Sequence, residues 1–255
     1  MVEPTPHLSV QLRHRVGALD IDAEFHLTQP WTILFGPSGS GKTTILRAIA
    51  GLIRPDHACI VSIFRAGPKC APCITLVDTA KAICLPAHMR GAPLAAQQAR
   101  LFPNKNVLEN MKYGYPGVGS PGEQDFRDEL IAKLPSVFLI ENLLQKLPRE
   151  LSGGETQRAS LARAAMTCNK RILLLDEPFT GLDFPLRDAL IANLAAWQET
   201  SKTPILSVTH DVAEAFQLDA EVIKLSAGRI VQQGPVATVL AEERARLLEQ
   251  LTPSE

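Results

Sequence analysis

The chain has 255 residues and a formal net charge of −1, from 26 lysine and arginine against 27 acidic residues. This balance excludes a global basic field for nucleic acid, and 45% hydrophobic residues exclude an intrinsically disordered chain. No stretch reaches the roughly 18 apolar residues of a membrane span, and the start lacks a signal-peptide pattern. Both absences lead us to expect a cytoplasmic protein, and five cysteines without a secretion signal favour reduced thiols.

Short runs of β-branched and aliphatic residues predict strands at 32–35, 172–175, 205–208 and 222–225. Helical patterns follow several of these runs, and that alternation predicts a parallel βα sheet. One helix is predicted over 185–197, where apolar residues recur every three or four positions after an N-terminal proline.

A glycine-rich loop follows the first of these strands and precedes the helical run ILRAIAGL. Its glycines allow a tight turn, so that successive backbone N–H groups and the helix N-terminus face phosphate oxygens. Lys42 would reach the β and γ phosphates of a nucleotide, and the Thr43 hydroxyl would ligate Mg²⁺. The predicted phosphate-binding loop comprises Gly36, Pro37, Ser38, Gly39, Ser40, Gly41, Lys42, Thr43 and Thr44. By itself the loop leaves kinases, GTPases and many ATPases open.

The pattern changes between about 104 and 166, where apolar residues at helical spacing predict an inserted helical lobe. One of its helices is predicted over 126–134. Residues 113–122 are dense in glycine and proline and predict a loop.

Two adjacent acids follow the apolar run 172–175. Acids at the carboxyl end of a strand lie where α/β sheets place ligands. We expect Asp176 to hold Mg²⁺, directly or through water, and Glu177 to orient and deprotonate an attacking water. A kinase would instead position an acceptor hydroxyl, so the pair favours hydrolysis.

The segment LSGGETQR, residues 151–158, resembles the signature motif of ABC ATPases, which other phosphate-loop enzymes lack. Ser152 is expected to cap the helix that follows. Gly153 and Gly154 remove side chains, so that the backbone can approach a γ-phosphate at the positive end of the helix dipole.

The resemblance extends to three further motifs. Asp183, in FTGLDF, matches the acid of the family's D-loop, and His210 matches the switch histidine that contacts the γ-phosphate and steadies the catalytic water. Residues 211–214 are spaced as a capping box for the next helix. Gln97 resembles the Q-loop glutamine that bridges Mg²⁺ and the contact surface for a membrane partner, with Gln98 as the competing assignment.

The family's architecture implies an α/β P-loop NTPase core with an antiparallel β portion near the N-terminus and an inserted helical signature lobe. Mapped on this chain, it makes 1–255 a single domain, with a catalytic core at about 1–96 and 167–240. The helical lobe spans about 97–166 and a charged tail spans 241–255. The segment SAGRIVQQGP looks like the family's terminal hairpin.

In this family, the signature helix of one chain covers the nucleotide held by the phosphate loop of another. The resemblance therefore implies a homodimer that binds ATP and Mg²⁺ and hydrolyses ATP. It also implies integral membrane permease subunits as partners and an indirect link to a substrate-binding protein, with no nucleic acid. The expected location is peripheral, on the cytoplasmic face of the cell membrane.

The segment ICLPAHMR followed by QQARLFP looks closest to ATPases of molybdate-type oxyanion importers. A non-transport ABC ATPase acting on nucleic acid or ribosomes is the alternative, which a basic tail or long insertions would favour. A degenerate, non-hydrolysing module is the third reading, and it is disfavoured by the intact set Lys42, Asp176, Glu177 and His210.

Two features depart from the family's pattern. Many relatives stack an aromatic residue on adenine, but residues 15–18 contain none, and Phe25 and Trp31 are predicted to be core residues. Cys70 and Cys73 form a single CxxC, whereas a zinc site needs two further ligands, so we expect an incidental or buried pair.

Overall fold

The computed structural model describes residues 7–63, 73–115, 121–168 and 171–251. The chain forms two compact units, one made of Met1–Arg90 with Leu206–Glu255, the other of Gly91–Ile205. These limits differ from those of the core and lobe outlined from the sequence, and that division stays a prediction. Across the described ranges, none of the helices combines the length and apolar character needed to cross a membrane.

The first unit is built on a sheet that is antiparallel at one end and parallel at the other. Its strands are β1 (Leu8–Val16), β2 (Leu19–Leu27), β3 (Trp31–Phe35), β4 (His57–Ile63), β5 (Cys73–Asp78), β6 (Ile83–Cys84), β9 (Ile205–Thr209), β10 (Glu221–Ser226) and β11 (Arg229–Pro235). They lie in the order β6-β5-β4-β1-β2-β11-β10-β3-β9. β1 is antiparallel to β2 and β4, β10 is parallel to β3, and β10 and β11 form a hairpin. The predicted antiparallel portion and terminal hairpin are confirmed.

The core of this unit follows from the side-chain alternation of its strands. In β2, the apolar residues from Ile21 to Leu27 are buried at every second position, with exposed residues between them. All five residues of β3 are buried, as expected for an inner strand of a parallel sheet. Phe25 is 2% exposed and Trp31 is 7% exposed, which confirms both as core residues.

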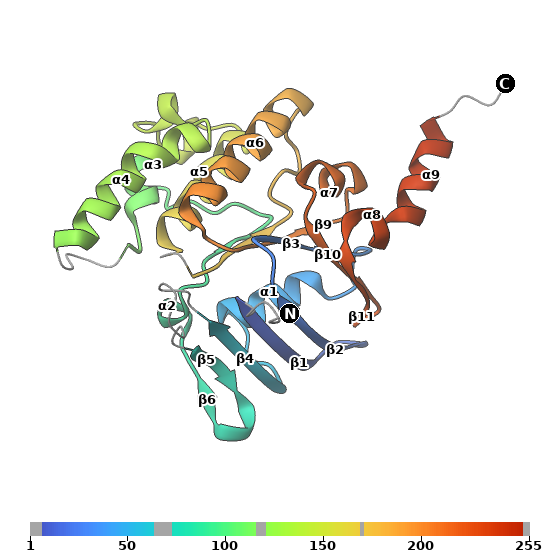
Figure 1. Ribbon diagram of the computed structural model, residues 1–255. Coiled ribbons are helices and arrows are strands. Elements are labelled where there is room, and N and C mark those ends of the chain that lie inside the picture. Colours follow the sequence, from blue (N-terminus) through green and yellow to red (C-terminus); the bar gives the residue numbers. More distant parts are fainter. Residues whose placement is uncertain (1–6, 64–72, 116–120, 169–170, 252–255) are drawn as a thin grey trace. The chain divides into compact units, whose positions relative to one another are not determined.

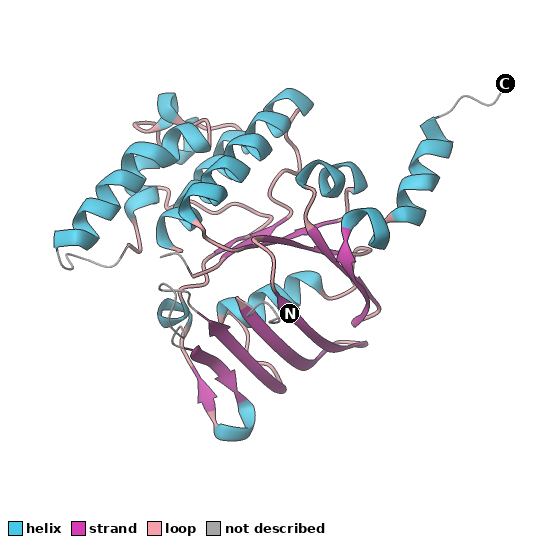
Figure 2. Cartoon of the chain, in the orientation of Figure 1, coloured by secondary structure: helices cyan, strands magenta, loops and turns pink. Residues whose placement is uncertain are grey.

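The helices of the first unit are α1 (Lys42–Ala50), α2 (Ala87–Arg90), α7 (Val212–Leu218), α8 (Val236–Val239) and α9 (Ala241–Leu251), with a 3₁₀ turn η1 (Thr79–Lys81). Figure 2 shows α1 lying against the strands of the same unit. The start of α9 is held by an ion pair of 2.7 Å between Lys224 Nζ and Glu243 Oε1. The Arg244 guanidinium also lies 5.1 Å from the centre of the Phe216 ring.

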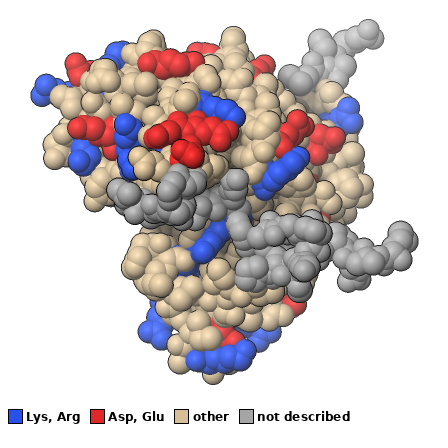
Figure 3. Space-filling view, turned by 60° about the vertical axis from the view of Figure 1, so that its left-hand side comes forward, with Lys and Arg blue, Asp and Glu red and all other residues tan. Residues whose placement is uncertain are grey.

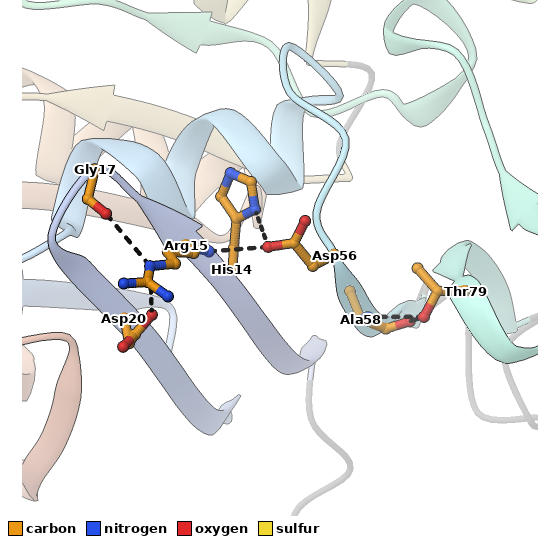
Figure 4. A network of polar contacts seen from close by, with 7 residues as sticks. All are labelled: His14, Arg15, Gly17, Asp20, Asp56, Ala58 and Thr79. Atoms are coloured by element: carbon orange, nitrogen blue, oxygen red, sulfur yellow. Dashed lines mark hydrogen bonds and ion pairs between the residues drawn. The ribbon is translucent and has the colours of Figure 1, made fainter.

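A polar network ties the end of β1 to the segment before β4 (Figure 4). Asp56 Oδ2 accepts a hydrogen bond from Arg15 N at 2.9 Å and lies 3.0 Å from His14 Nδ1. The backbone donor from Arg15 is the main reason why the pKa of Asp56 is lowered. Arg15 Nε in turn donates to Gly17 O at 3.4 Å and lies 3.5 Å from Asp20 Oδ1. Both contacts stabilise the turn between β1 and β2.

Arg90 is only 1% exposed and closes the C-terminal end of α1. Its Nη1 donates to Ala48 O at 2.6 Å and to Ile49 O at 3.1 Å, and its Nε donates to Leu85 O at 2.7 Å. The last carbonyls of a helix lack intrahelical donors and carry the negative end of the dipole. A buried cation at this place therefore satisfies both the hydrogen bonds and the charge.

Replacing Arg90 by Met should lower the free energy of unfolding by about 3 kcal/mol, because buried carbonyls lose a charged donor while the apolar stem is kept. Urea denaturation followed by circular dichroism measures the loss. Arg13→Met is the matched control, since the Arg13 side chain is 72% exposed and pairs with Asp22. The control should change stability by less than about 0.5 kcal/mol. Equal stabilities for the two variants would contradict the role of Arg90.

The second unit is mainly helical (Figure 1). Its elements are β7 (Leu94–Ala95), α3 (Val107–Lys112), α4 (Pro121–Val137), η2 (Glu141–Leu143), η3 (Pro148–Glu150), α5 (Gly153–Thr167), β8 (Leu173–Asp176) and α6 (Phe184–Ser201). Helix α5 packs against α3 and α4, and β7 is parallel to β8. The predicted helix over 185–197 is confirmed as the longer α6, and Leu190, Leu194 and Trp197 are buried on one face.

The predicted loop over 113–122 is wrong at its end, because α4 begins at Pro121. Proline is well tolerated in the first turn of a helix, where its missing N–H has no intrahelical acceptor. The residues 116–120 of that prediction lie outside the described residues. The helix predicted over 126–134 is confirmed within α4.

Candidate functional site

The loop between β3 and α1 has the backbone that its glycines predict. Gly39 has a φ of 79° and Gly41 a φ of 106°, in the left-handed region that favours glycine. Gly41 immediately precedes α1, and a Cβ there would lie 2.9 Å from Ile21 Cδ1. Pro37, Ser38 and Gly39 are exposed at the loop tip, whereas Gly36 and Ser40 are buried at its two ends.

Lys42 is the first residue of α1 and is 5% exposed. Its Nζ donates to Gly36 O at 2.7 Å and to Pro37 O at 2.8 Å, so the ammonium group is held over the loop. The first turn of α1 contains no acidic residue. Together with Thr43 and Thr44, which follow in that turn, the helix N-terminus presents donors and positive potential to an anion.

Asp176 and Glu177 occupy different environments at the end of β8. Asp176 is 3% exposed, and Glu177 is half-buried. Glu177 has a φ of 48°, a left-handed conformation that is uncommon for a residue with a side chain and is enriched at functional sites. Any role of either carboxylate toward a metal ion or a water molecule stays a prediction.

Gln97 and Glu177 are brought together in the second unit. Gln97 Nε2 donates to Glu177 Oε2 at 2.9 Å, and Thr180 Oγ1 lies 3.4 Å from the same oxygen. Gln97 and Gln98 both lie in the exposed bend after β7, and this contact favours Gln97. Thr180 lies in the segment FTGLDF, in which the sequence predicts a role for Asp183 alone.

Sequence reasoning also missed Asn110, which organises the chain that follows Gln97. Asn110 is fully buried, its Oδ1 accepts from Phe102 N at 2.8 Å, and its Nδ2 donates to Lys105 O at 2.9 Å. It shares the buried face of α3 with Val107 and Met111. A polar residue on an apolar helix face was the signal that could have revealed it.

The signature segment begins α5 with a complete capping box. Ser152 Oγ accepts from Glu155 N at 3.2 Å, and Glu155 Oε2 accepts from Ser152 N at 2.7 Å. The backbone donor from Ser152 is the main reason why the pKa of Glu155 is lowered. Gly153 is exposed, and a Cβ on Gly154 would lie 3.1 Å from Leu182 Cδ2. The predicted cap is confirmed.

Asp183 and His210 each stand at the end of an element. Asp183 is the N-cap of α6, where its Oδ1 accepts from Leu186 N at 2.9 Å. His210 directly follows β9 and is exposed. Any contact of either residue with a nucleotide stays a prediction.

The capping box predicted over 211–214 is wrong in its second half. Asp211 Oδ1 accepts from Ala213 N at 2.8 Å and from Glu214 N at 3.2 Å, so the first half is present. Glu214, however, is 5% exposed, and its Oε2 accepts from Thr209 Oγ1 at 3.1 Å. This contact links α7 to the end of β9, which residue spacing alone does not reveal.

The predicted residues fall into both compact units. The phosphate loop 36–44 and His210 belong to the first unit, whereas Gln97, Ser152, Gly153, Gly154, Asp176, Glu177 and Asp183 belong to the second. Within the described ranges, no three His, Cys, Asp or Glu side chains are grouped to hold a metal ion. Cys73 is exposed on β5, so the expectation of a buried pair is wrong for this residue, and Cys70 lies outside the described residues.

Figure 3 shows described side chains of both charges on one face of the molecule, without a continuous basic stripe on that face. This distribution agrees with the near-neutral net charge of −1.

Comparison with known proteins gives consistent matches. The family model for ABC transporters matches residues 22–180. The molybdenum import ATP-binding protein ModC of Mesorhizobium japonicum is 37% identical over 242 residues, which cover 92% of this chain and 62% of that protein. The molybdate/tungstate import ATP-binding protein WtpC of Archaeoglobus fulgidus is 33% identical over 245 residues, covering 96% of this chain and 94% of the relative. The chain thus spans less than two thirds of the first relative.

A solved ATP-binding cassette, described as a dimer in a post-hydrolysis state bound to ADP and Pi, has the same fold. The TM-score is 0.69 at 24% sequence identity, and the match covers 90% of this chain and 98% of that one. The fold class predicted from the sequence is confirmed.

Proposed function

Since this chain belongs to the ABC transporter family, we propose that it binds and hydrolyses ATP as the motor subunit of an importer for molybdate or a related oxyanion. The observation that carries the hydrolytic part is the hydrogen bond of 2.9 Å from Gln97 Nε2 to Glu177 Oε2. The substrate class is supported by relatives that are named for molybdenum import and for molybdate/tungstate import.

Phosphate binding is assigned to the loop 36–44. Its left-handed glycines and the N-terminus of α1 supply backbone donors, and Lys42 supplies the positive charge. Lys42 Nζ donates to the carbonyls of Gly36 and Pro37, which hold the ammonium group at the loop.

Mg²⁺ prefers hard oxygen ligands, and each of the residues proposed to hold it carries such an oxygen. We assign the Asp176 carboxylate, the Thr43 hydroxyl and the Gln97 amide to it. The amide nitrogen of Gln97 is used by Glu177, which leaves Gln97 Oε1 as the atom for the metal. When bound, Mg²⁺ supplies positive charge that stabilises the charge developing on the transferred phosphoryl group.

Glu177 acts as the general base in this mechanism. Its Oε2 is oriented by Gln97 Nε2 and Thr180 Oγ1, and a proton from the attacking water passes to the carboxylate. Nucleophilic attack at phosphorus is then made by an oxygen that already carries negative charge. His210 contacts the γ-phosphate and steadies the same water.

A complete site requires a second copy of the chain, which makes the motor a homodimer. The cap of α5 uses the Glu155 amide, and we assign the preceding Gly153 and Gly154 amides to the γ-phosphate of ATP held by the partner copy. We also assign Asp183, another residue of the second unit, to the nucleotide-binding residues. ATP then joins the two copies, and loss of the γ-phosphate releases them.

The remaining proposals concern the protein partners of the homodimer and its location in the cell. We propose that the homodimer binds integral membrane permease subunits at the cytoplasmic face of the cell membrane. It would work indirectly with a substrate-binding protein. The Gln97 segment and the helical lobe, about 97–166, would transmit the motion, and the catalytic core would comprise about 1–96 and 167–240.

Affinity isolation of the native complex from solubilised membranes, in MgATP, tests this function. We expect recovery of a membrane permease, and molybdate uptake by vesicles that contain the recovered complex. Uptake should need ATP inside the compartment that holds the motor. Recovery of ribosomes or DNA-repair proteins without a membrane subunit would overturn the transport role and leave the ATPase chemistry standing.

A further inference from the structure

The turn between β10 and β11 contacts the phosphate loop. Gly228 N donates to Ser40 O at 3.1 Å, and Gly228 O accepts from Asp22 N at 2.8 Å. Gly228 has a φ of 79°, and a Cβ there would lie 2.3 Å from Asp20 O. The turn is therefore fitted tightly between β2 and the end of the loop, and a side chain at position 228 would displace it.

The start of the same loop rests on β10. A Cβ on Gly36 would lie 2.1 Å from Leu225 O, so only glycine allows this approach. The contact follows from sheet pairing, because β10 runs parallel to β3 and Lys224 lies opposite Phe35. One hairpin thus supports both ends of the phosphate loop, although it lies far from the loop in sequence.

The hydrogen bond from Gly228 fixes the orientation of one peptide group. In a planar trans peptide the C=O and the N–H point in opposite directions. With Ser40 O turned toward Gly228 N, the Gly41 N–H is turned away from the hairpin. Ser40 is 3% exposed, so its carbonyl has little access to water as a substitute donor.

We propose that the Ala227–Gly228 turn is a positioning element for the phosphate loop, which aims the Gly41 N–H at the phosphates of ATP. The inference rests on the proposed function, since it concerns the nucleotide that the loop holds. Gly41 O accepts from Ile45 N at 3.0 Å as the first hydrogen bond of α1. The two peptides that flank Gly41 are thus each fixed by one bond, one from the hairpin and one from the helix.

Gly228→Ala tests the proposal, with Gly17→Ala as its matched control. Gly17 has a φ of 60° in the β1–β2 turn, where a Cβ would meet nothing within 4 Å (Figure 4). Both variants add one methyl group in a left-handed conformation, but only the first collides with backbone. Gly228→Ala should raise KM for MgATP by about tenfold with kcat changed less than about twofold, because the loop binds ground and transition states alike. Gly17→Ala should keep both constants.

A second variant separates the hydrogen bond from the packing. Glycolate in place of Gly228, introduced by protein ligation, replaces the N–H by an ester oxygen and adds no methyl group. The melting temperature without nucleotide should then fall by only about 4 °C, from the loss of one hydrogen bond, while KM for MgATP still rises about tenfold. If the native chain hydrolyses ATP and the ester variant keeps the native KM, the inference is overturned and the proposed function stands. If the native chain shows no MgATP turnover, the proposed function itself fails.

Discussion

Replacing Glu177 by Gln should lower kcat for ATP hydrolysis by at least about 100-fold, because an amide cannot take the proton of the attacking water. Glutamine keeps the shape of the side chain, and its amide oxygen can still accept from Gln97 Nε2, which lies 2.9 Å from Glu177 Oε2. The Kd for MgATP should therefore stay within about twofold of the native value. Phosphate release under saturating MgATP and equilibrium nucleotide binding measure the two quantities.

The same variant should accumulate as a dimer. If ATP joins two copies and hydrolysis separates them, blocking hydrolysis leaves the joined state populated. Size-exclusion chromatography in MgATP should show a dimer for Glu177→Gln, and a mainly monomeric native chain once its ATP is consumed. Glu199→Gln, at an exposed position of α6, is the control and should behave as the native chain. Native turnover in Glu177→Gln would exclude this carboxylate as the general base.

The sequence predicted the elements whose signals are local. The run over 172–175 gave β8 within one residue, because buried parallel strands are continuously apolar. The phosphate loop was also predictable from a local signal, because glycine adopts the left-handed φ seen at Gly39 and Gly41 without steric cost. Ser152 as a helix cap likewise depends only on Glu155, three residues on.

Features that depend on distant partners were not predictable. A charged residue such as Arg90 is normally exposed, and only the fold brings the end of α1 to it. Gln97 meets Glu177 from 80 residues away, so its sequence position alone did not exclude Gln98. Glu214 has the spacing of a capping box, but its buried carboxylate accepts a hydrogen bond from the Thr209 hydroxyl at the end of β9.

Replacing Lys42 by Ala should raise the Kd for MgATP by at least about 100-fold. In the proposed site, the Lys42 ammonium is the side-chain cation of loop 36–44 that contacts the β and γ phosphates. Charge-assisted hydrogen bonds to two phosphate groups are worth about 3 kcal/mol. Lys42 is 5% exposed, so solvent screens the interaction little. Equilibrium dialysis with labelled ATP and Mg²⁺ measures the affinity.

The matched control for Lys42→Ala is Lys81→Ala, a lysine of the same unit whose side chain is 74% exposed and pairs with Asp78. It should bind MgATP as the native chain does. The melting temperature without nucleotide shows whether the loss of donors to Gly36 O and Pro37 O also weakens the fold. If the Lys42→Ala variant has the native melting temperature and the native Kd for MgATP, the assignment of triphosphate binding to loop 36–44 is wrong. That result would also contradict the proposal that the β10–β11 hairpin aims the Gly41 N–H at the phosphates of ATP, because this proposal requires ATP to bind at the loop.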